Sequence, residues 1–518
     1  MKQTTLLLSS LALTVGIVAT GCTNQSTPKN APLLHKPPHG VYYEVFVRSF
    51  ADSNGDGVGD LKGLTQKLDY LQDLGVEGLW LMPINASPSY HGYDTTDYKA
   101  VNPTYGTADD MKQLVQEAHK RNMSVLLDFV ANHTSNRHPW FQSAESSPTS
   151  PYRDYYIWAT PTTNTKERGD TGQELWHGDP GNQYYAYFYD GMPDLNYDNP
   201  KVRQEIIQAG QYWLKDIGVD GFRLDAAKHI YSDPDPARNV AWWQEFRKGM
   251  EEVKPDVFLV GEIWDSPTVV APYLKGLNSA FDFDLSKMLI AAAQSESDSN
   301  LVSQLIATRQ LYAETAGKDY IDSTFLTNHD MDRTMSQLDG NVDHAKMAAS
   351  LLLTLPGDPF LYYGEELGME GKKPDEAIRE PILWKKDPKA PEQTNWEYAN
   401  YNTDNAAKSV EAEQASATSL YAHYRALIQA RRQSDVLIRG ELAEVPSIHA
   451  EGLVAFKRTL DDQSLLVVHN LSGKAQDVAL DGDLKSYQNT YFASTPEAKV
   501  KSNALTMPPY SSIILQRS

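Results

Sequence analysis

The chain has 518 residues, of which 41% are hydrophobic and 10% aromatic, so it has enough apolar material for a large core or several domains. Its formal net charge of −21 argues against binding to nucleic acid or anionic lipid head groups through a general electrostatic attraction. The single cysteine, Cys22, excludes an intramolecular disulfide and a metal site built from several cysteines.

The N-terminus has the features of an export signal. Lys2 precedes an apolar stretch, Leu6–Ala19, which is shorter than the ~20 residues that a transmembrane helix needs. A positive start, a short apolar stretch and small residues are typical of a secretory signal. The residues Ala19-Thr20-Gly21-Cys22 resemble a bacterial lipobox, in which the cysteine becomes the lipidated first residue of the mature protein. An ordinary cleaved signal with a chance cysteine is the alternative.

We therefore interpret residues 1–22 as a lipoprotein signal peptide. Residues 23–38 are polar and rich in proline, without hydrophobic periodicity, and this is typical of a tether. The sequence predicts an exported protein, lipid-anchored at the bacterial cell envelope or secreted, with its folded part starting near His39.

Strand-like and helix-like segments alternate from Val41 onward. Amphipathic stretches such as Leu61–Leu74 and Ala108–Arg121 lie between β-branched and aromatic runs. Eight such alternations predict an α/β fold, a (β/α)₈ TIM barrel. The predicted strands are Val41–Val47, Glu77–Met82, Met123–Phe129, Val219–Leu224, Asp256–Gly261, Ser279–Phe283, Ser323–Thr327 and Asp358–Tyr362.

The interval after the third predicted strand is the longest, and residues 134–194 within it are rich in Tyr, Asp, Gly and Pro. We expect them to form an inserted domain beside the barrel mouth, with the barrel itself spanning 39–133 and 195–436. A helix is predicted at Ala415–Gln433. Residues 437–518 are predicted to form a small antiparallel β domain with strands at Glu441–Val445, Gly452–Arg458, Ser464–Asn470, Asp477–Leu480 and Ser511–Leu515.

Four of the predicted barrel strands deliver a carboxylate at their C-terminal ends. These are Asp128, Asp225, Glu262 and Asp330, most of them with His or Arg close by. The C-terminal ends of barrel strands converge on one mouth, so the four side chains are expected to share a pocket. A single Asp at such a place is most often a helix N-cap, but four ends carrying a carboxylate make that explanation improbable.

The sequence has these carboxylates but no phosphate-binding glycine motif, and this favours an enzyme that cleaves acetals. A glycosidic bond needs one carboxylic acid to protonate the leaving oxygen and one carboxylate to attack or to activate water. Arg223 and Asp225 are two residues apart and point to the same face of a strand, so the guanidinium should keep Asp225 ionised. Glu262 lies next to Trp264 in an apolar sequence and is the better candidate for the acid/base role.

At these residues the chain resembles the α-amylase family, glycoside hydrolase family 13. The resemblance runs from about His39 to the C-terminus and includes four signature regions in order, with MPDLN (residues 192–196) as an additional marker. The four regions are DFVANH (128–133), GFRLDAAKH (221–229), GEIW (261–264) and FLTNHD (325–330).

The resemblance implies a retaining hydrolase that cleaves internal α-1,4 bonds of starch and maltooligosaccharides. It implies Asp225 as nucleophile, Glu262 as general acid/base and Asp330 as transition-state stabiliser. It names the insertion domain B and the β tail domain C. The residues expected to bind the α-glucan substrate are Tyr93, Asp94, His133, Arg223, Lys228, His229, Trp264 and His329.

Two signals within the family disagree about specificity. Lys228-His229 resembles true α-amylases, whereas Asp94 and the MPDLN marker resemble the branch between oligo-1,6-glucosidases and neopullulanases. An oligo-1,6-glucosidase or neopullulanase-like activity with transglycosylation is therefore the alternative. A non-catalytic binding protein on the same scaffold is a further alternative, which the presence of all three acids disfavours.

The segment after the first strand resembles a calcium loop. Residues that can offer an oxygen ligand stand at alternate positions from Asp52 to Asp60, with a glycine after the third of them. This spacing matches the first nine positions of an EF-hand calcium loop. The glutamate usual at the twelfth position is absent, and a simple Asx/Gly turn is the alternative. The family resemblance favours Ca²⁺, with the ligands Asp52, Asn54, Asp56, the Val58 carbonyl and Asp60. It also implies a second calcium site that includes Asn132 and the His229 carbonyl.

Replacement of Cys22 by Ser should abolish lipidation and release soluble protein, because the lipid is attached through a thioether. Fractionation of the two proteins expressed in a bacterial host would check this. Unchanged membrane association of the variant would contradict the lipoprotein interpretation.

Overall fold

The computed structural model describes residues 38–231, 236–298, 300–448 and 450–517. Cys22, the signal peptide and nearly all of the tether lie outside these residues. Among the described residues, no helix is both long and apolar enough to span a membrane.

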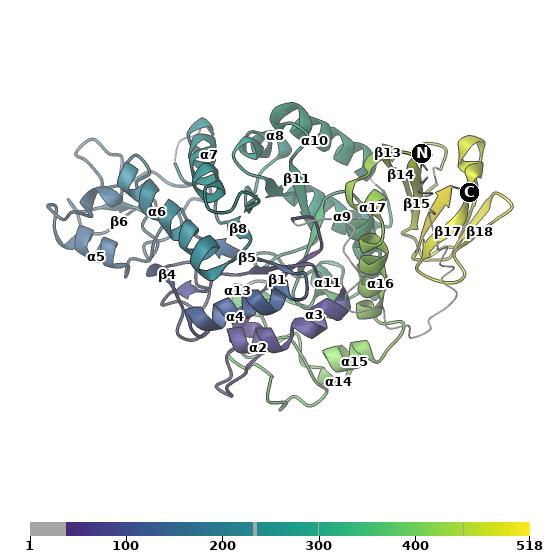
Figure 1. The fold of residues 1–518 in the computed structure, drawn as a ribbon, viewed down its shortest axis with the longest axis horizontal. Coiled ribbons are helices and arrows are strands. Elements are labelled where there is room, and N and C mark those ends of the chain that lie inside the picture. The colour runs from purple at the N-terminus through teal and green to yellow at the C-terminus, as the bar shows by residue number, and fades with distance from the viewer. Residues whose placement is uncertain (1–37, 232–235, 299, 449, 518) are drawn as a thin grey trace, which may run out of the picture.

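Eight parallel strands form a closed barrel, so the predicted fold class is confirmed (Figure 1). Their order around the barrel is β1-β12-β11-β10-β9-β8-β5-β2. Each strand overlaps one predicted from the sequence. Their bounds are β1 Tyr42–Val45, β2 Gly78–Leu81, β5 Ser124–Phe129, β8 Gly221–Leu224, β9 Phe258–Gly261, β10 Ser279–Phe281, β11 Ile321–Phe325 and β12 Asp358–Tyr362.

Aromatic rings fill the interior of the barrel. Tyr42 and Phe360 stack with ring centroids 4.7 Å apart, and Phe281 lies 5.2 Å from Trp80. These rings belong to a separate buried cluster with contributions from seven of the eight strands. Because side chains alternate along a strand, Tyr42 and Glu44 both point inward. The barrel interior thus holds a cluster of aromatic rings together with the buried carboxylate of Glu44.

The helices pack around the barrel and cover its outer face. The predicted helix Leu61–Leu74 is interrupted at Lys67, whose backbone (φ −99°, ψ 2°) separates two shorter helices. The helices outside the insertion are α1 Val47–Phe50, α2 Leu61–Gln66, α3 Leu68–Leu74, α4 Ala108–His119, α6 Pro200–Tyr212, α7 Ala237–Glu251, α8 Pro267–Val270, α9 Phe283–Ser295, α10 Leu301–Ala316, α11 Thr334–Gln337, α12 Val342–Thr354, α13 Asp375–Ile378, α14 Asn405–Lys408, α15 Val410–Gln414, α16 Leu420–Arg432 and α17 Asp435–Arg439.

The segment after β5 makes the excursion expected for the insertion. It contains α5 (Pro139–Ser146) and a small hairpin of β6 (Trp176–His177) and β7 (Tyr184–Tyr185). A bridge between His133 and Asp194 closes its base. A second small sheet, β3 (Asn85–Ala86) with β4 (Asp97–Val101), follows β2.

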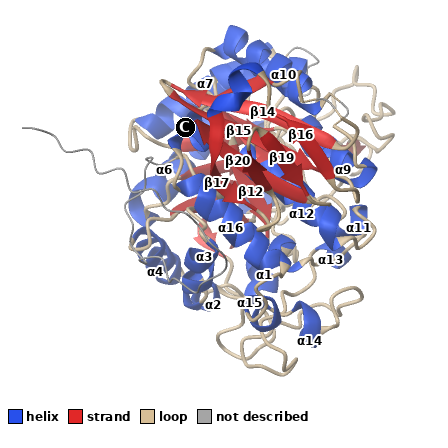
Figure 2. Cartoon of the chain, turned by 90° about the vertical axis from the view of Figure 1, so that its right-hand side faces the viewer, coloured by secondary structure: helices blue, strands red, loops and turns tan. Residues whose placement is uncertain are grey.

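The C-terminal residues form two antiparallel sheets at the end of the molecule opposite the insertion (Figures 1 and 2). Five of their strands were predicted, whereas β17, β18 and β19 were not, because β18 and β19 are short and β17 is mostly half-buried. The strands are β13 Glu441–Glu444, β14 Leu453–Leu460, β15 Gln463–Asn470, β16 Gln476–Ala479, β17 Tyr487–Ala493, β18 Lys499–Lys501, β19 Ala504–Met507 and β20 Ser511–Arg517.

A buried arginine joins this domain to the barrel, and a second one binds the same helix end. Arg458 on β14 donates to the carbonyl oxygens of Gly440 (2.9 Å) and Thr354 (2.7 Å). Arg431 on α16 donates to the carbonyls of Leu353 and Leu355, at the C-terminal end of α12. Carbonyls at a helix end lack partners within the helix, so these guanidinium groups satisfy them, and the bond from Arg458 to Thr354 links the two domains.

Candidate active site

The predicted acids gather at the C-terminal ends of four barrel strands. Asp128 lies on β5 and Arg223 on β8. Asp225 is the first residue after β8, and Glu262 is the first residue after β9. Asp128 and Arg223 stand opposite each other in the register of β5 and β8. Gly221 permits the close approach of β8 to β9, since a Cβ there would lie 1.9 Å from the Phe258 carbonyl oxygen.

One buried guanidinium holds three of these carboxylates. Arg223 is 1% exposed, and its Nη1 donates to Oδ1 of Asp128 (2.8 Å) and Oδ1 of Asp225 (2.6 Å). Its Nη2 lies 2.9 Å from Oε2 of Glu262. The Asp225 and Glu262 carboxylates therefore face each other across a common cation.

The backbone after Asp225 adds a second link between the two acids. Ala226 has a φ of 46°, in the left-handed region that is unusual for a residue other than glycine. Its N–H donates to Oε2 of Glu262 at 2.9 Å. Glu262 is thus surrounded by polar donors rather than by the apolar groups expected from its sequence neighbours. Trp264 instead stacks on Phe283, with ring centroids 4.6 Å apart.

Burial and ion pairing act in opposite directions on the inner acids. Burial raises the pKa of Asp225, while the Arg223 guanidinium beside it lowers this pKa. Burial likewise raises the pKa of Asp128, against the same guanidinium. Ion pairing with Arg223 was expected to be the dominant influence on Asp225, but burial is the larger one.

Asp330 belongs to a second charged group on the other side of the mouth. Its Oδ1 accepts from Nη2 of Arg379 (2.9 Å), and its Oδ2 lies 3.0 Å from Nε2 of His329. Burial alone would raise the pKa of Asp330, but His329 and Arg379 hold that pKa well below its usual range. Asp330 is accordingly ionised at neutral pH.

His329 is held between two carboxylates. Its Nδ1 lies 2.5 Å from Oε1 of Glu44 on β1, and both side chains are buried. Burial lowers the pKa of His329, but Asp330 and Glu44 overcome this and raise it to about 9. The ring is therefore an imidazolium cation at neutral pH.

Tyr93 connects the two charged groups. Its hydroxyl donates to Oδ2 of Asp128 (3.0 Å) and lies 2.5 Å from Nε2 of His329. Its ring lies nearly parallel to the His329 ring, at 5.5 Å between centroids. The indole N–H of Trp80 also donates to Oδ2 of Asp128, at 3.2 Å.

Three further residues predicted to bind the substrate form hydrogen bonds with neighbouring protein groups. His133 donates through Nε2 to the Tyr93 carbonyl, and burial lowers its pKa to about 4. Asp94 is buried and accepts from the hydroxyl groups of Ser87 and Ser89. Lys228 donates to the Trp264 carbonyl (3.0 Å) and to Asp265 (3.1 Å).

His229 lies against the insertion. Its ring is 4.1 Å from that of Tyr187 and 5.9 Å from that of Phe188, and burial lowers its pKa to about 4. Phe188 also contacts the His133 ring, with centroids 5.3 Å apart. Phe188 and Tyr189 remain about 40% exposed, so the insertion presents two aromatic side chains beside the site.

Two residues of the site were not found from the sequence. Glu44 is a charged residue within an apolar strand, and that contrast is a signal that could have identified it. Arg379 follows the short helix α13 and carries no local signal. Only the fold brings it to Asp330.

The predicted calcium loop supplies oxygen atoms of the right kind. Asp52 and Asp60 are buried, and within the described part of the chain neither forms an ion pair with Lys or Arg. Backbone N–H groups of Asn54, Gly55 and Gly57 donate to Asp52, at 2.7–2.9 Å. Carboxylate, amide and carbonyl oxygens suit Ca²⁺, although the described residues hold no cluster of three or more Asp, Glu, His or Cys groups arranged for a metal.

Asn132, one of the two residues expected at a second calcium site, lies beside Asp194 of the insertion. The Asn132 Oδ1 atom is buried without a hydrogen-bond partner among the described residues. Asp194 accepts from Tyr187 N (3.0 Å), and burial raises its pKa to about 8, although a hydrogen bond from Asn132 acts against this. A buried carboxyl beside an unpartnered amide oxygen has the donor chemistry that a calcium ion needs.

Comparisons with known proteins agree with this geometry. The chain matches the family model described as alpha amylase, catalytic domain, over residues 44–440, and the alpha-amylase SusG C-terminal domain over residues 453–514. It is 44% identical to Alpha-amylase 3 of Dictyoglomus thermophilum over 478 residues, which cover 92% of this chain and 93% of that protein.

Two further relatives bear on the fold and the chemistry. The crystal structure of the alpha-amylase from H. orenii has a TM-score of 0.86 and 45% identity, and the match covers 93% of this chain and 99% of that one. A 4-alpha-glucanotransferase of Thermotoga neapolitana is 36% identical over 439 residues, which cover 83% of this chain and 96% of that protein. The chain belongs to the α-amylase family, glycoside hydrolase family 13, and is a glycoside hydrolase of the α-amylase type.

Proposed function

We propose that the protein hydrolyses internal α-1,4-glucosidic bonds of starch and maltooligosaccharides with retention of configuration. The observation that carries this proposal is the attachment of Asp225 and Glu262 to one buried guanidinium, with ionised Asp330 across the mouth. Two carboxyl groups fixed beside each other are the arrangement that a double displacement at an anomeric carbon requires.

The hydrogen bonds support a role for one particular oxygen atom of each acid. Arg223 engages Oδ1 of Asp225, which leaves Oδ2 to attack the anomeric carbon. Arg223 and the Ala226 N–H engage Oε2 of Glu262, which leaves Oε1 to carry the proton. Glu262 protonates the glycosidic oxygen as Asp225 forms a covalent glycosyl ester. It then takes a proton from the water that cleaves this ester.

Asp330 and His329 act on the charge that develops in the transition state of each step. The transition state resembles an oxocarbenium ion, and the carboxylate of Asp330 stabilises its positive charge. The His329 imidazolium and the Arg379 guanidinium hold Asp330 in place and keep it ionised. Glu44 acts through His329, because its carboxylate keeps that ring protonated.

Transfer to another sugar is the second candidate activity. A relative that shares 36% identity is named a 4-alpha-glucanotransferase. Phe188 and Tyr189 expose aromatic side chains beside the site, where they could hold an acceptor sugar in place of water. Asp94 and the MPDLN marker support a side activity on α-1,6 bonds.

The proposal also includes a calcium site and export with a lipid anchor. Calcium bound by Asp52, Asn54, Asp56, the Val58 carbonyl and Asp60 would neutralise two buried carboxylates and stabilise the first loop of the barrel. We also infer that Cys22 anchors the exported protein to a membrane by its lipid. We also propose that the barrel domain spans residues 39–133 and 195–436, with the insertion at 134–194 and the C-terminal domain at 437–518.

Product analysis on starch, pullulan, cyclodextrin and isomaltose tests the proposed bond and the proportion of transfer. The anomer first released from a maltooligosaccharide, read by proton NMR, should be α.

Asp225→Asn should stop turnover even with an activated leaving group. Glu262→Gln should retain the first step with such a substrate and accumulate an intermediate that azide releases.

A β anomer as first product would mean inversion, and Asp225 could not then be the nucleophile. Equal loss of both steps in Glu262→Gln, without rescue by azide, would contradict the assignment of Glu262.

Glu44→Gln should move the alkaline limb of the kcat/KM profile to lower pH. The substitution removes the negative charge that holds the proton on His329, so the ring loses its proton as pH rises well before its present pKa of about 9. We expect a shift of about one pH unit or more, measured with an aryl maltoside between pH 5 and 10. Glu366→Gln is the matched control, because Glu366 is also buried but binds Tyr43 and Tyr70 away from His329. An unshifted alkaline limb in Glu44→Gln would refute the role of Glu44.

Removal of calcium should lower the thermal midpoint, because a site present only in the folded state stabilises it by about 2.7 kcal/mol at a calcium concentration of 100 times Kd. Elemental analysis should find the metal. Asp56→Ala should abolish this dependence on chelator, because it removes one of the proposed ligands. The Asp56 side chain is exposed and accepts a hydrogen bond from the Val58 N–H, so its loss should disturb the rest of the fold little. A metal-free protein with a midpoint indifferent to chelator would exclude the site.

A further inference from the structure

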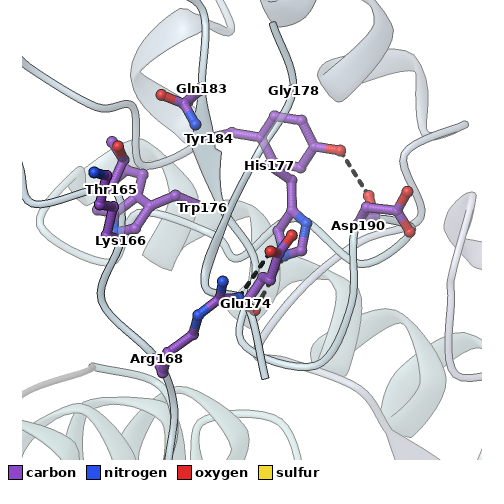
Figure 3. A pocket seen from close by; sticks show the side chains of 10 residues that line it. All are labelled: Thr165, Lys166, Arg168, Glu174, Trp176, His177, Gly178, Gln183, Tyr184 and Asp190. Atoms are coloured by element: carbon purple, nitrogen blue, oxygen red, sulfur yellow. Dashed lines mark hydrogen bonds and ion pairs between the residues drawn. The ribbon is translucent and has the colours of Figure 1, made fainter. Parts of the chain in front are cut away.

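The insertion contains a hollow of about 550 Å³ that the proposed reaction does not use. It is bounded by the β6–β7 hairpin and by residues 165–168, and Figure 3 shows its side chains from close by. This volume is within the range of sites that hold small ligands. It shares no lining residue with the active site. The lining residues are Thr165, Lys166, Arg168, Glu174, Trp176, His177, Gly178, Gln183, Tyr184 and Asp190.

Two aromatic rings form part of its wall and are held in place. The Trp176 ring packs edge-on against Tyr185, with centroids 5.4 Å apart. The Tyr184 hydroxyl donates to the Asp190 carbonyl at 2.7 Å, which fixes that ring.

The charges in the hollow balance, and this argues for a neutral ligand. Lys166 and Arg168 are cationic, while Glu174 and Asp190 are anionic, and Arg168 is paired with Glu174 at 2.8 Å. An anionic ligand would meet as many carboxylates as cations. A ligand rich in hydroxyl groups can donate to the carboxylates and accept from the ammonium of Lys166 and the amide of Gln183. Sugar rings also present apolar C–H faces that suit aromatic walls.

The hollow is connected to the active site through a short segment. Asp190 lines it, and four residues later Asp194 is bridged to His133 at the rim of the cleft. Tyr187, between them, contacts His229. A chain bound in the hollow would therefore be held close to the cleft, which raises its effective concentration there.

We propose that this hollow is a second carbohydrate site that binds a segment of an α-linked gluco-oligosaccharide outside the active site. The choice of sugar rests on the proposed function, whereas the existence of the site rests on the hollow itself. Its role is to retain a long glucan between cleavage events, so short substrates should not depend on it.

Titration calorimetry with maltoheptaose tests the proposal in the full chain carrying Asp225→Asn, which prevents hydrolysis. This protein should bind at two sites. Adding Trp176→Ala should abolish the second site or weaken it about tenfold, which corresponds to about 1.4 kcal/mol. Adding Tyr398→Ala, which removes an aromatic ring that is 79% exposed elsewhere on the surface, should leave both sites.

Two sites of unchanged affinity after Trp176→Ala would overturn the proposal. If that variant lowers the thermal midpoint, the combined Lys166→Ala and Gln183→Ala change serves instead and should weaken the same site several-fold. In the parent enzyme, Trp176→Ala should slow amylose hydrolysis while leaving an aryl maltoside unaffected. If the proposed function is wrong and the cleft binds no glucan, the Asp225→Asn protein should show one site, which Trp176→Ala removes.

Discussion

The active site depends on a guanidinium buried at the mouth of the barrel. Arg223 reaches Asp128, Asp225 and Glu262 at 2.6–2.9 Å while almost completely removed from water. A charge in such a place is tolerated only when it is paired, and breaking a buried pair typically costs about 3–5 kcal/mol. The same contacts that satisfy this cation therefore also determine where the two reacting carboxylates stand. The ion pairs of Arg223 thus both compensate its buried charge and position the reacting carboxylates.

The barrel core supports this interaction from below. The Arg223 guanidinium lies 5.3 Å from the centroid of the Trp80 ring, and Trp80 also donates to Asp128. The rings of Tyr42, Phe281 and Phe360 are buried and belong to one cluster with Trp80. Electrostatic interactions are stronger where water is excluded. The aromatic interior thus serves the chemistry as well as the stability of the fold.

The sequence predicted the architecture well because its signals are local. Each barrel strand is a short apolar run, and the acids stand directly after such runs. Prediction was less complete where structure depends on distant contacts. The break at Lys67 and the half-exposed strand β17 leave little trace in hydrophobic periodicity. The surroundings of Glu262 were misjudged because its polar partners, Arg223 and the Ala226 N–H, come from another strand. Arg379 could be placed only by the fold.

The charged groups at the mouth form two networks that meet at one residue. Arg223 organises the acids that form and break bonds, while His329 and Arg379 hold the carboxylate that faces the developing cation. The Tyr93 hydroxyl touches Asp128 in the first network and His329 in the second. Since nearly all of these groups are buried and hydrogen-bonded before a substrate arrives, little reorganisation remains for the reaction itself. The neutral Tyr93 hydroxyl joins the two networks without adding a charge, and the carboxylates of each network compensate its own cation.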